Sequence, residues 1–208
     1  MKQILCFGDS NTWGYNGETG DRYQEEERWT TILQKKLGTE EYRVIEDGLC
    51  GRTTVFEDPY VSGRCGSAAL PVALQACQPL DAIVLMLGTN DCKAVFQANA
   101  EKIGRGIEVL LDQIREGAPQ AKVLLVSPIF LGEKVWHEEY DLEFSWESVE
   151  VSKQLSKVYE EIAARREIGF MRASDYAWSG EADQEHMDRQ GHAMLAEGIC
   201  KVLKENIL

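Results

Sequence analysis

The sequence predicts an α/β fold, a three-layer αβα sandwich around a five-stranded parallel sheet. Short apolar runs alternate along the chain with longer stretches in which apolar residues recur at helical spacing. Most of the short runs are continuous rather than alternating with polar residues, which is typical of strands covered on both faces. Strands that alternate with helices form parallel sheets through right-handed crossovers.

Five apolar runs are the expected strands. They lie at residues 4–7, 42–45, 82–87, 123–126 and 169–171. Four stripes of apolar residues at helical spacing lie at 29–37, 103–114, 155–162 and 195–203. The 208 residues suit one well-packed core, so we expect a single flavodoxin-like domain over residues 1–208.

The composition excludes several classes of partner. The chain has 22 lysines and arginines against 35 acidic residues, a net charge of −13, which repels nucleic acid and anionic lipid. No apolar stretch approaches the ~20 residues of a membrane span, and the N-terminus is charged too early for a signal peptide. We therefore expect a cytoplasmic protein with no membrane partner, whose 6 cysteines stay reduced.

Two regions outside the expected strands and helices have unusual compositions. The first, 16–28, is rich in glycine and acidic residues, whereas the second, 133–146, mixes acidic residues with aromatic ones. The second is too aromatic for a plain solvated loop, and the sequence leaves open whether it is a lid, a pocket wall or a subunit contact. Its ring-bearing side chains are Trp136, His137, Tyr140, Phe144 and Trp146.

Four chemically useful residues follow the expected strands. Ser10 follows the first strand, Gly51 the second and Asn90 the third, and His186 lies beyond the fifth. Ligands of open parallel sheets bind beyond the carboxyl ends of the strands. The four residues are therefore expected at one edge of the sheet.

A serine nucleophile needs a base and a carboxylate that orients the base. The chain offers residues of these types in Ser10, His186 and Asp183. Asp183 and His186 are three residues apart, so on a helical turn or a tight loop they point the same way. Other interpretations remain: Ser10 also suits a helix N-cap, and the surroundings of His186 also suit a solvated acidic loop. The combination of the three residues favours catalysis.

Gly51 and Asn90 are candidates for stabilising an oxyanion. A glycine lets its N–H approach a substrate oxygen closely, and the Asn90 amide is a further donor. The N–H of Ser10 itself completes the expected oxyanion hole. Each of these residues, taken alone, is also consistent with an ordinary turn.

The other two histidines are not expected to act. His192 lies in the last helical stripe without a carboxylate at the Asp183 spacing, which favours a structural or surface position, and His137 is expected to face solvent. His186 and His192 are six residues apart, which matches no helical face. We therefore expect no metal and no cofactor.

Four ordered sequence blocks resemble the SGNH hydrolases, also called GDSL esterases/lipases. The blocks are Gly8-Asp9-Ser10, Gly51, Gly88-Thr89-Asn90-Asp91 and Asp183-x-x-His186. The surrounding residues look like the bacterial arylesterase/acyltransferase branch. The resemblance implies Ser10 as nucleophile, His186 as base, Asp183 as its orienter, and an oxyanion hole from Ser10, Gly51 and Asn90. Some members of that branch form homo-oligomers and transfer acetyl groups to alcohols.

These observations predict a serine esterase that acts on small-molecule esters with short acyl groups, mainly acetyl. Acyl transfer to alcohols, carbohydrate deacetylation and thioesterase or lysophospholipase activity are alternatives that use the same triad. A flavodoxin-like binding protein would share the predicted fold and would bind phosphate at a helix N-terminus after Gly8. Asp9 places a negative charge there, and this alternative leaves Asp183 and His186 without a role.

Overall fold

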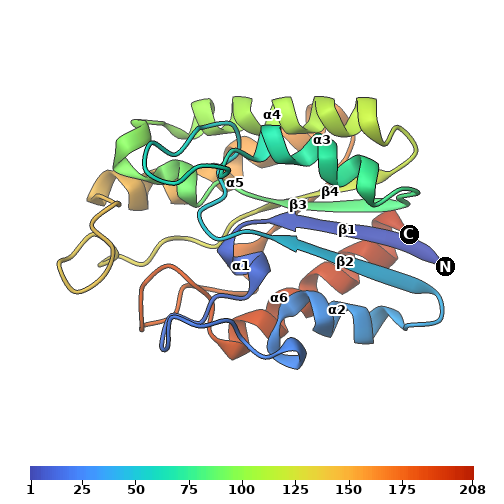
Figure 1. Cartoon of the computed structure of the whole chain (residues 1–208), viewed down its shortest axis with the longest axis horizontal. Helices are drawn as coiled ribbons and strands as arrows, with labels where there is room; N and C mark the ends of the chain where they lie inside the picture. The colour runs from blue at the N-terminus through green and yellow to red at the C-terminus, as the bar shows by residue number, and fades with distance from the viewer.

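The computed structural model describes residues 1–208 and has a single parallel sheet at its centre (Figure 1). The strand order is β2-β1-β3-β4-β5, and every neighbouring pair is parallel. All five expected strands are present, so the predicted sheet is confirmed. The strands are β1 (Lys2–Gly8), β2 (Tyr42–Gly48), β3 (Ala82–Met86), β4 (Lys122–Ser127) and β5 (Gly169–Arg172).

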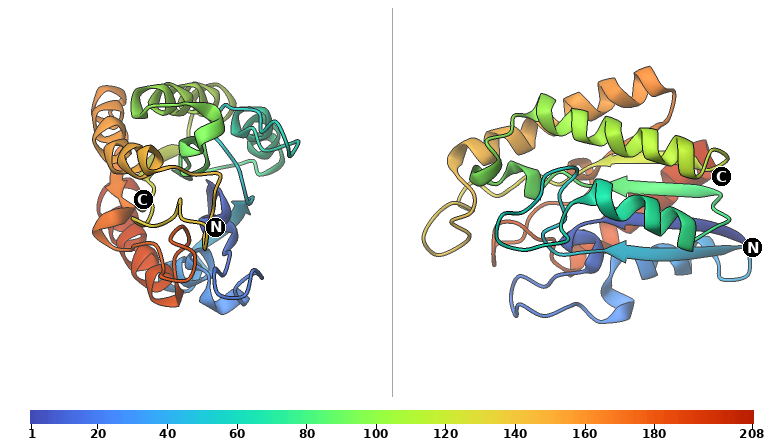
Figure 2. Two further views of the ribbon diagram at one scale, coloured as in Figure 1. Left: turned by 90° about the vertical axis from the view of Figure 1, so that its left-hand side faces the viewer. Right: turned by 45° about the horizontal axis from the view of Figure 1, so that its top comes forward.

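Helices cover both faces of the sheet, which confirms the three-layer sandwich (Figures 1 and 2). One face carries α2 (Trp29–Leu37) and α6 (Arg189–Val202). The other carries α3 (Gly66–Ala76), α4 (Ala100–Gly117) and α5 (Trp146–Arg166). Shorter elements complete the chain: α1 (Ser10–Trp13), the 3₁₀ turns Glu25–Glu27, Asn90–Cys92, Ala94–Phe96 and Ala173–Asp175, and a π-helical turn Leu203–Ile207.

The continuous apolar runs fill two separate cores. In β1, Ile4 and Cys6 face the core under α2 and α6, whereas Leu5 and Phe7 face the core under α3, α4 and α5. Successive side chains of a strand point to opposite faces, so a strand buried on both sides needs an apolar residue at every position. This is why the central strands β1, β3 and β4 lack a polar alternation.

Helix α3 is the one long helix that the apolar stripes did not predict. Pro71 lies inside it and has no N–H to donate to the carbonyl of Ser67, one turn earlier. The side chain of Gln113 on α4 supplies the missing bond, since its Nε2 donates to the Ser67 oxygen at 2.8 Å. A contact from another element thus compensates for a residue that normally interrupts a helix.

The carboxyl ends of all five strands lie at one edge of the sheet, where the longest loops gather (Figure 1). From β1 the chain passes to β2 on one side and then to β3 on the other side. This reversal at the end of β1 is the place where open α/β sheets bind ligands.

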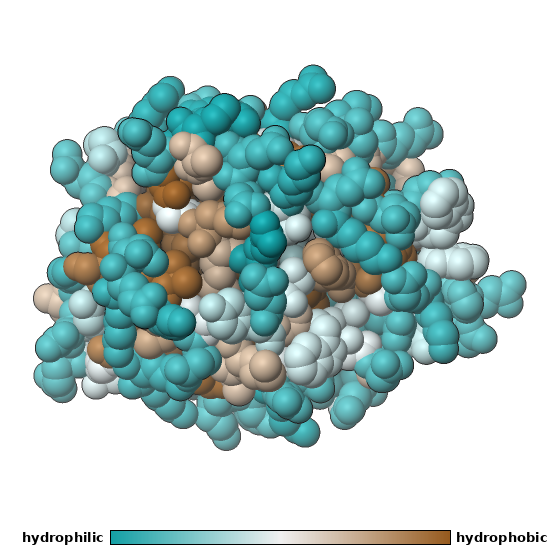
Figure 3. Space-filling model, turned by 180° about the vertical axis from the view of Figure 1, so that it is seen from behind, coloured by the Kyte–Doolittle hydropathy of each residue, from teal (hydrophilic) through white to brown (hydrophobic).

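None of the helices combines the length and the apolar character that a membrane span needs, and the surface seen from behind is mostly hydrophilic (Figure 3).

Candidate active site

Ser10 lies directly beyond β1, as expected, at the first position of the short helix α1. The chain before this helix has no room for a side chain at Gly8, because a Cβ atom there would come within 2.9 Å of the Met86 carbonyl oxygen and closer still to the Thr12 side chain. The alternative interpretation of Ser10 as a helix cap is wrong. Asp9 is the cap, and its Oδ1 accepts the N–H of Asn11 at 3.0 Å.

The structure brings Ser10, His186 and Asp183 into one chain of hydrogen bonds. The distance from Ser10 Oγ to His186 Nε2 is 2.8 Å, and that from His186 Nδ1 to Asp183 Oδ2 is 2.7 Å. Asp183 and His186 belong to a tight loop before α6, and Asp183 Oδ1 also accepts the N–H groups of Glu185 and His186. Because His186 and Glu185 are buried, this segment is not a solvated loop.

The electrostatics of the pair suit a histidine base. Burial raises the pKa of Asp183, but the hydrogen bond and charge of His186 outweigh it and hold that pKa below its ordinary value. Burial lowers the pKa of His186, but the Glu185 and Asp183 carboxylates outweigh it, and that pKa lies above its ordinary value. Asp183 therefore stays ionised and supports a positive charge on the imidazole.

Three residues at this edge of the sheet each have a hydrogen-bond donor without an acceptor in the protein. The N–H groups of Ser10 and Gly51 donate to no group in the protein. The Asn90 amide donates one hydrogen to the Arg52 carbonyl at 3.2 Å and retains a second one. Gly51 has a φ of 78°, a left-handed conformation that favours glycine. All three residues that were expected to form an oxyanion hole thus lie at the same edge of the sheet.

Buried polar contacts hold these donor loops in place. The Arg52 guanidinium donates to the Gly8 and Asp47 carbonyl oxygens at 2.9 and 2.7 Å, and so ties the loop after β2 to the end of β1. The Asp91 carboxylate accepts the N–H of Thr54 at 2.9 Å, which joins the loops after β2 and β3. Positions fixed in this way keep the donors oriented before a substrate arrives.

Three further residues lie beside the triad, although the sequence patterns gave them no such role. Asn11 and Tyr15 contact the segment that carries Asp183 and His186, and Glu185 lies within that segment. Asn11 Oδ1 accepts the N–H of Met187 at 3.0 Å, and its amide donates to the Glu185 carbonyl at 3.5 Å. The Tyr15 ring lies 4.3 Å from the His186 ring between centroids. The only signal in the sequence for Asn11 is its position next to Ser10.

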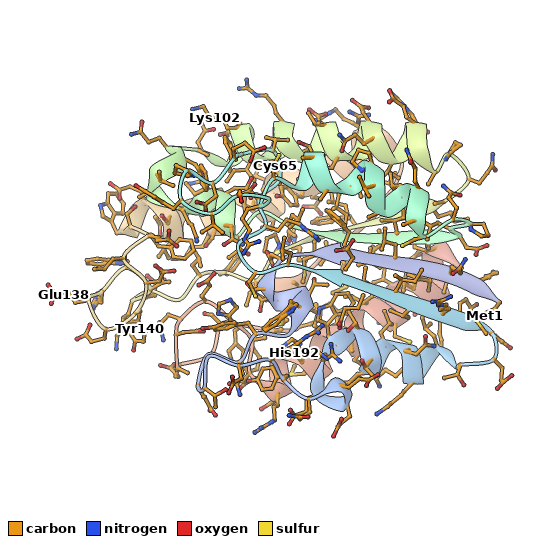
Figure 4. All side chains as sticks on the ribbon, viewed as in Figure 1. Met1, Cys65, Lys102, Glu138, Tyr140 and His192 are labelled. Carbon is orange, nitrogen blue, oxygen red and sulfur yellow. The ribbon has the colours of Figure 1, made fainter.

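The remaining histidines lie outside the triad. His192 is fully buried (labelled in Figure 4), which agrees with a structural rather than a surface position. Burial lowers the pKa of His192 to about 4, so it is neutral at neutral pH. His137 is partly exposed and packs against Trp136. No group of three potential metal-ligating side chains lies close enough to hold an ion.

The loop at 133–146 packs against the triad segment at its base and projects from the sheet edge at its tip. Phe144 belongs to the buried core, and the Gly132 N–H donates to the Gln184 carbonyl at 2.7 Å. Glu138 and Tyr140 lie at the far end of the projection (Figure 4). The base of this loop is thus a wall beside the candidate site.

A cavity of about 520 Å³ lies elsewhere, between α4 and α5, and no triad residue lines it.

Comparisons with known proteins point to one family. The family model of GDSL-like lipases/acylhydrolases matches residues 6–194. The aryl esterase of M. smegmatis is 32% identical with a TM-score of 0.92, and the match covers 100% of both chains. Est24, a carbohydrate acetylesterase from Sinorhizobium meliloti, is 32% identical with a TM-score of 0.90, over 98% of this chain and 99% of that one. Among curated proteins, none matches the chain.

Proposed function

This chain belongs to the GDSL-like lipase/acylhydrolase family, and its structural neighbours support a carboxylic ester hydrolase. From that premise we propose a serine esterase that hydrolyses short-chain acyl esters, mainly acetyl esters. The observation that carries the proposal is the continuous hydrogen-bond chain from Ser10 through His186 to Asp183, with distances of 2.8 and 2.7 Å.

In the first step, Ser10 Oγ attacks the ester carbonyl carbon while its proton passes to His186 Nε2. Asp183 remains ionised and stabilises the imidazolium. The oxyanion accepts hydrogen bonds from the Ser10 N–H, the Gly51 N–H and the free N–H of the Asn90 amide. The bond to the alcohol oxygen then breaks, and the alcohol leaves with the proton from His186.

In the second step, His186 takes a proton from water, whose oxygen attacks the acyl group on Ser10. The same three donors bind the second oxyanion. Collapse of this intermediate breaks the bond to Ser10 Oγ, which regains its proton from His186. Acyl transfer to an alcohol would follow the same path, with the alcohol in place of water.

The preference for short acyl groups is supported by the close packing around the nucleophile. Ser10 and Asn90 are only 3% and 2% exposed, and the Tyr15 ring covers one side of His186. A carbohydrate acetylesterase is the second candidate, because the carbohydrate acetylesterase from Sinorhizobium meliloti shares 32% identity with this chain over almost its whole length. Both candidates use the same acyl group and the same triad.

The test is turnover of p-nitrophenyl esters from acetate to laurate by the wild type and by Ser10→Ala. We expect the highest kcat/KM on acetate and loss of that activity in the variant. A preference for long chains would contradict the acetyl assignment, and turnover that survives Ser10→Ala would contradict the mechanism. Acetate release from acetylated sugars then separates the two candidates.

A further inference from the structure

Glu185 is a carboxylate inside the candidate site that the proposed mechanism does not use. The residue is only 7% exposed, and its Oε1 lies 3.7 Å from His186 Nε2. That nitrogen is the one that contacts Ser10 Oγ. Burial raises the pKa of this carboxyl above its ordinary value, and no protein group donates a hydrogen bond to it.

The carboxylate is held by an ordered backbone. The Glu185 N–H donates to Asp183 Oδ1 at 3.0 Å, and its carbonyl faces the Asn11 amide at 3.5 Å. The next residue, Met187, is bound by Asn11 through its N–H. The segment on both sides of His186 is therefore fixed, and the Glu185 side chain has a defined position beside the imidazole.

No neighbouring cation pairs with Glu185 in place of a ligand. Burial is the largest influence on the Glu185 carboxyl and raises its pKa above the ordinary value, and the positive charge of Lys93 offsets this only in part. Lys93 does not pair with Glu185, because its Nζ pairs with Glu143 Oε2 at 2.5 Å. Asp141 and Asp183 add negative charge instead. A nearly buried acceptor without a donor is costly, so a hydrogen-bond donor on a bound molecule would stabilise it.

The position of Glu185 matches that of the molecule that attacks the acyl-enzyme. The attacking oxygen must lie within about 2.6–3.2 Å of the base that takes its proton. Two acceptors 3.7 Å apart can both be reached by one oxygen at hydrogen-bond distance from each. A water molecule has two hydrogens and can donate one to His186 Nε2 and the other to Glu185 Oε1.

We propose that Glu185 selects the acyl acceptor, because its carboxylate binds the second hydrogen of the attacking water. This inference rests on the proposed esterase function. In the step, the water oxygen bonds to the acyl carbon, one water proton moves to His186 Nε2, and the bond from that carbon to Ser10 Oγ breaks as His186 returns the proton to Ser10. Glu185 accepts a hydrogen bond throughout and takes no proton.

A monohydric alcohol has only one O–H, which goes to His186, so it cannot also bind Glu185. It would leave the carboxylate without a donor, whereas a diol offers a second hydroxyl. Glu185 thus favours hydrolysis over transfer to simple alcohols, and it favours acceptors with a second hydroxyl over those with one. The substrate class that follows is the polyhydroxylated acceptor, in the same site.

The experiment measures how the acyl-enzyme partitions between acceptors. p-Nitrophenyl acetate is the donor, 1-propanol and 1,3-propanediol are the acceptors, and the ratio of acetate ester to free acetate is read by gas chromatography. Glu185→Leu should raise the transfer-to-hydrolysis ratio for 1-propanol by about tenfold, the effect of losing one hydrogen bond to a charged group. Glu185→Gln keeps an acceptor oxygen and should raise it less.

The matched control is Glu181→Gln, which removes an acidic charge from the same loop at an exposed position and should leave the ratio unchanged. Because the ratio compares two fates of one intermediate, it does not depend on the fraction of folded enzyme. An unchanged ratio in Glu185→Leu, or an equal rise in Glu181→Gln, would overturn the inference.

A second readout uses the wild type alone. It should transfer acetate to 1,3-propanediol more readily than to 1-propanol at equal hydroxyl concentration, and Glu185→Leu should lose this preference. A wild type that does not distinguish the two acceptors would contradict the inference. Absence of any Ser10-dependent release of p-nitrophenol would instead contradict the proposed function.

Discussion

The backbone N–H of Trp29 donates a hydrogen bond to His192 Nδ1 at 3.3 Å, and this contact joins the start of α2 to the inside of α6. The His192 ring also meets the Tyr23 ring edge-on, with centroids 5.2 Å apart. Both helices cover the same face of the sheet. His192 is thus a packing residue between two helices of the same layer, whereas His186, six positions earlier, faces Ser10.

The two histidines should therefore respond differently to substitution. His186→Ala should abolish turnover, because Ser10 loses its base. His192→Ala should leave kcat nearly unchanged while lowering the free energy of unfolding by about 1–3 kcal/mol, since it leaves the Trp29 N–H without a partner. Ester turnover at saturating substrate and urea unfolding measure the two effects, and an exchange of the two phenotypes would disprove the assignment of the base.

His192 should also make the protein less stable in acid. Its pKa is about 4 in the folded state and ~6.5 when unfolded. Below ~6.5 the unfolded chain binds more protons than the folded one, so the free energy of unfolding decreases as the pH is lowered. The total loss is roughly 3 kcal/mol once the pH is below 4. The charged or titratable neighbours that act on it are His186, Asp188, Glu27 and Arg28. Urea unfolding at several pH values should show a smaller acid loss in His192→Gln, and equal slopes would contradict this.

Catalytic activity should fall in acid for a different reason, the protonation of His186. The base must be neutral to accept the Ser10 proton, so kcat/KM should rise with pH through the pKa of His186. Burial lowers that pKa, but Glu185, Asp183 and Asp9 raise it above its ordinary value, so the midpoint should lie above ~6.5. Glu185→Gln should move the midpoint to lower pH in pH–rate profiles, and a midpoint shifted upward would count against this account.

Asn90→Ala should lower kcat by about 10²–10³, the typical cost of one oxyanion donor. The amide is already oriented by its bond to the Arg52 carbonyl, so the variant loses a donor that is in position before the substrate binds. The control is Asn99→Ala, which removes the cap of α4, where the Lys102 N–H donates to Asn99 Oδ1 at 2.9 Å. That variant should lose about 1 kcal/mol of stability and keep its kcat; equal losses of kcat would remove the argument for Asn90.

Gln113 and Pro71 should be coupled in a double-mutant cycle. Gln113→Ala leaves the Ser67 carbonyl of α3 without a donor and should cost about 1 kcal/mol of unfolding free energy. In a Pro71→Ala background the new N–H can bind the same carbonyl, so Gln113→Ala should cost less there. Additive effects in chemical denaturation would show that the contact does not compensate for the proline.

The sheet and most of its covering helices could be predicted because their signals are local. A buried parallel strand needs a run of apolar residues, and the segments containing Ile4, Ile83 and Leu124 have such runs. Helix α3 could not be predicted in this way. Its proline contradicts a helix locally, and the compensating group, Gln113, is more than forty residues away in sequence.

The residues of the candidate site likewise divide into those with a local signal in the sequence and those without one. Ser10, Asp183 and His186 could be selected because their chemistry is tied to residue type and to position after a strand. The role of Asn11 depends on hydrogen bonds to a segment 174 and 176 residues away, which no local pattern shows. Glu185 was hidden for another reason, since an acidic residue among Glu181 and Asp188 looks like part of a solvated surface.

The hydrogen bond between Ser10 and His186 joins residues 176 positions apart. During synthesis Ser10 leaves the ribosome before the four strands that follow β1, and His186 emerges only after all five strands. A nascent chain would therefore carry Ser10 without its proposed base while the strands between the two residues are made. Under the proposed mechanism, ester cleavage requires the segment before α6 to dock against the end of β1, so the onset of turnover would be a sensitive reporter of completed folding.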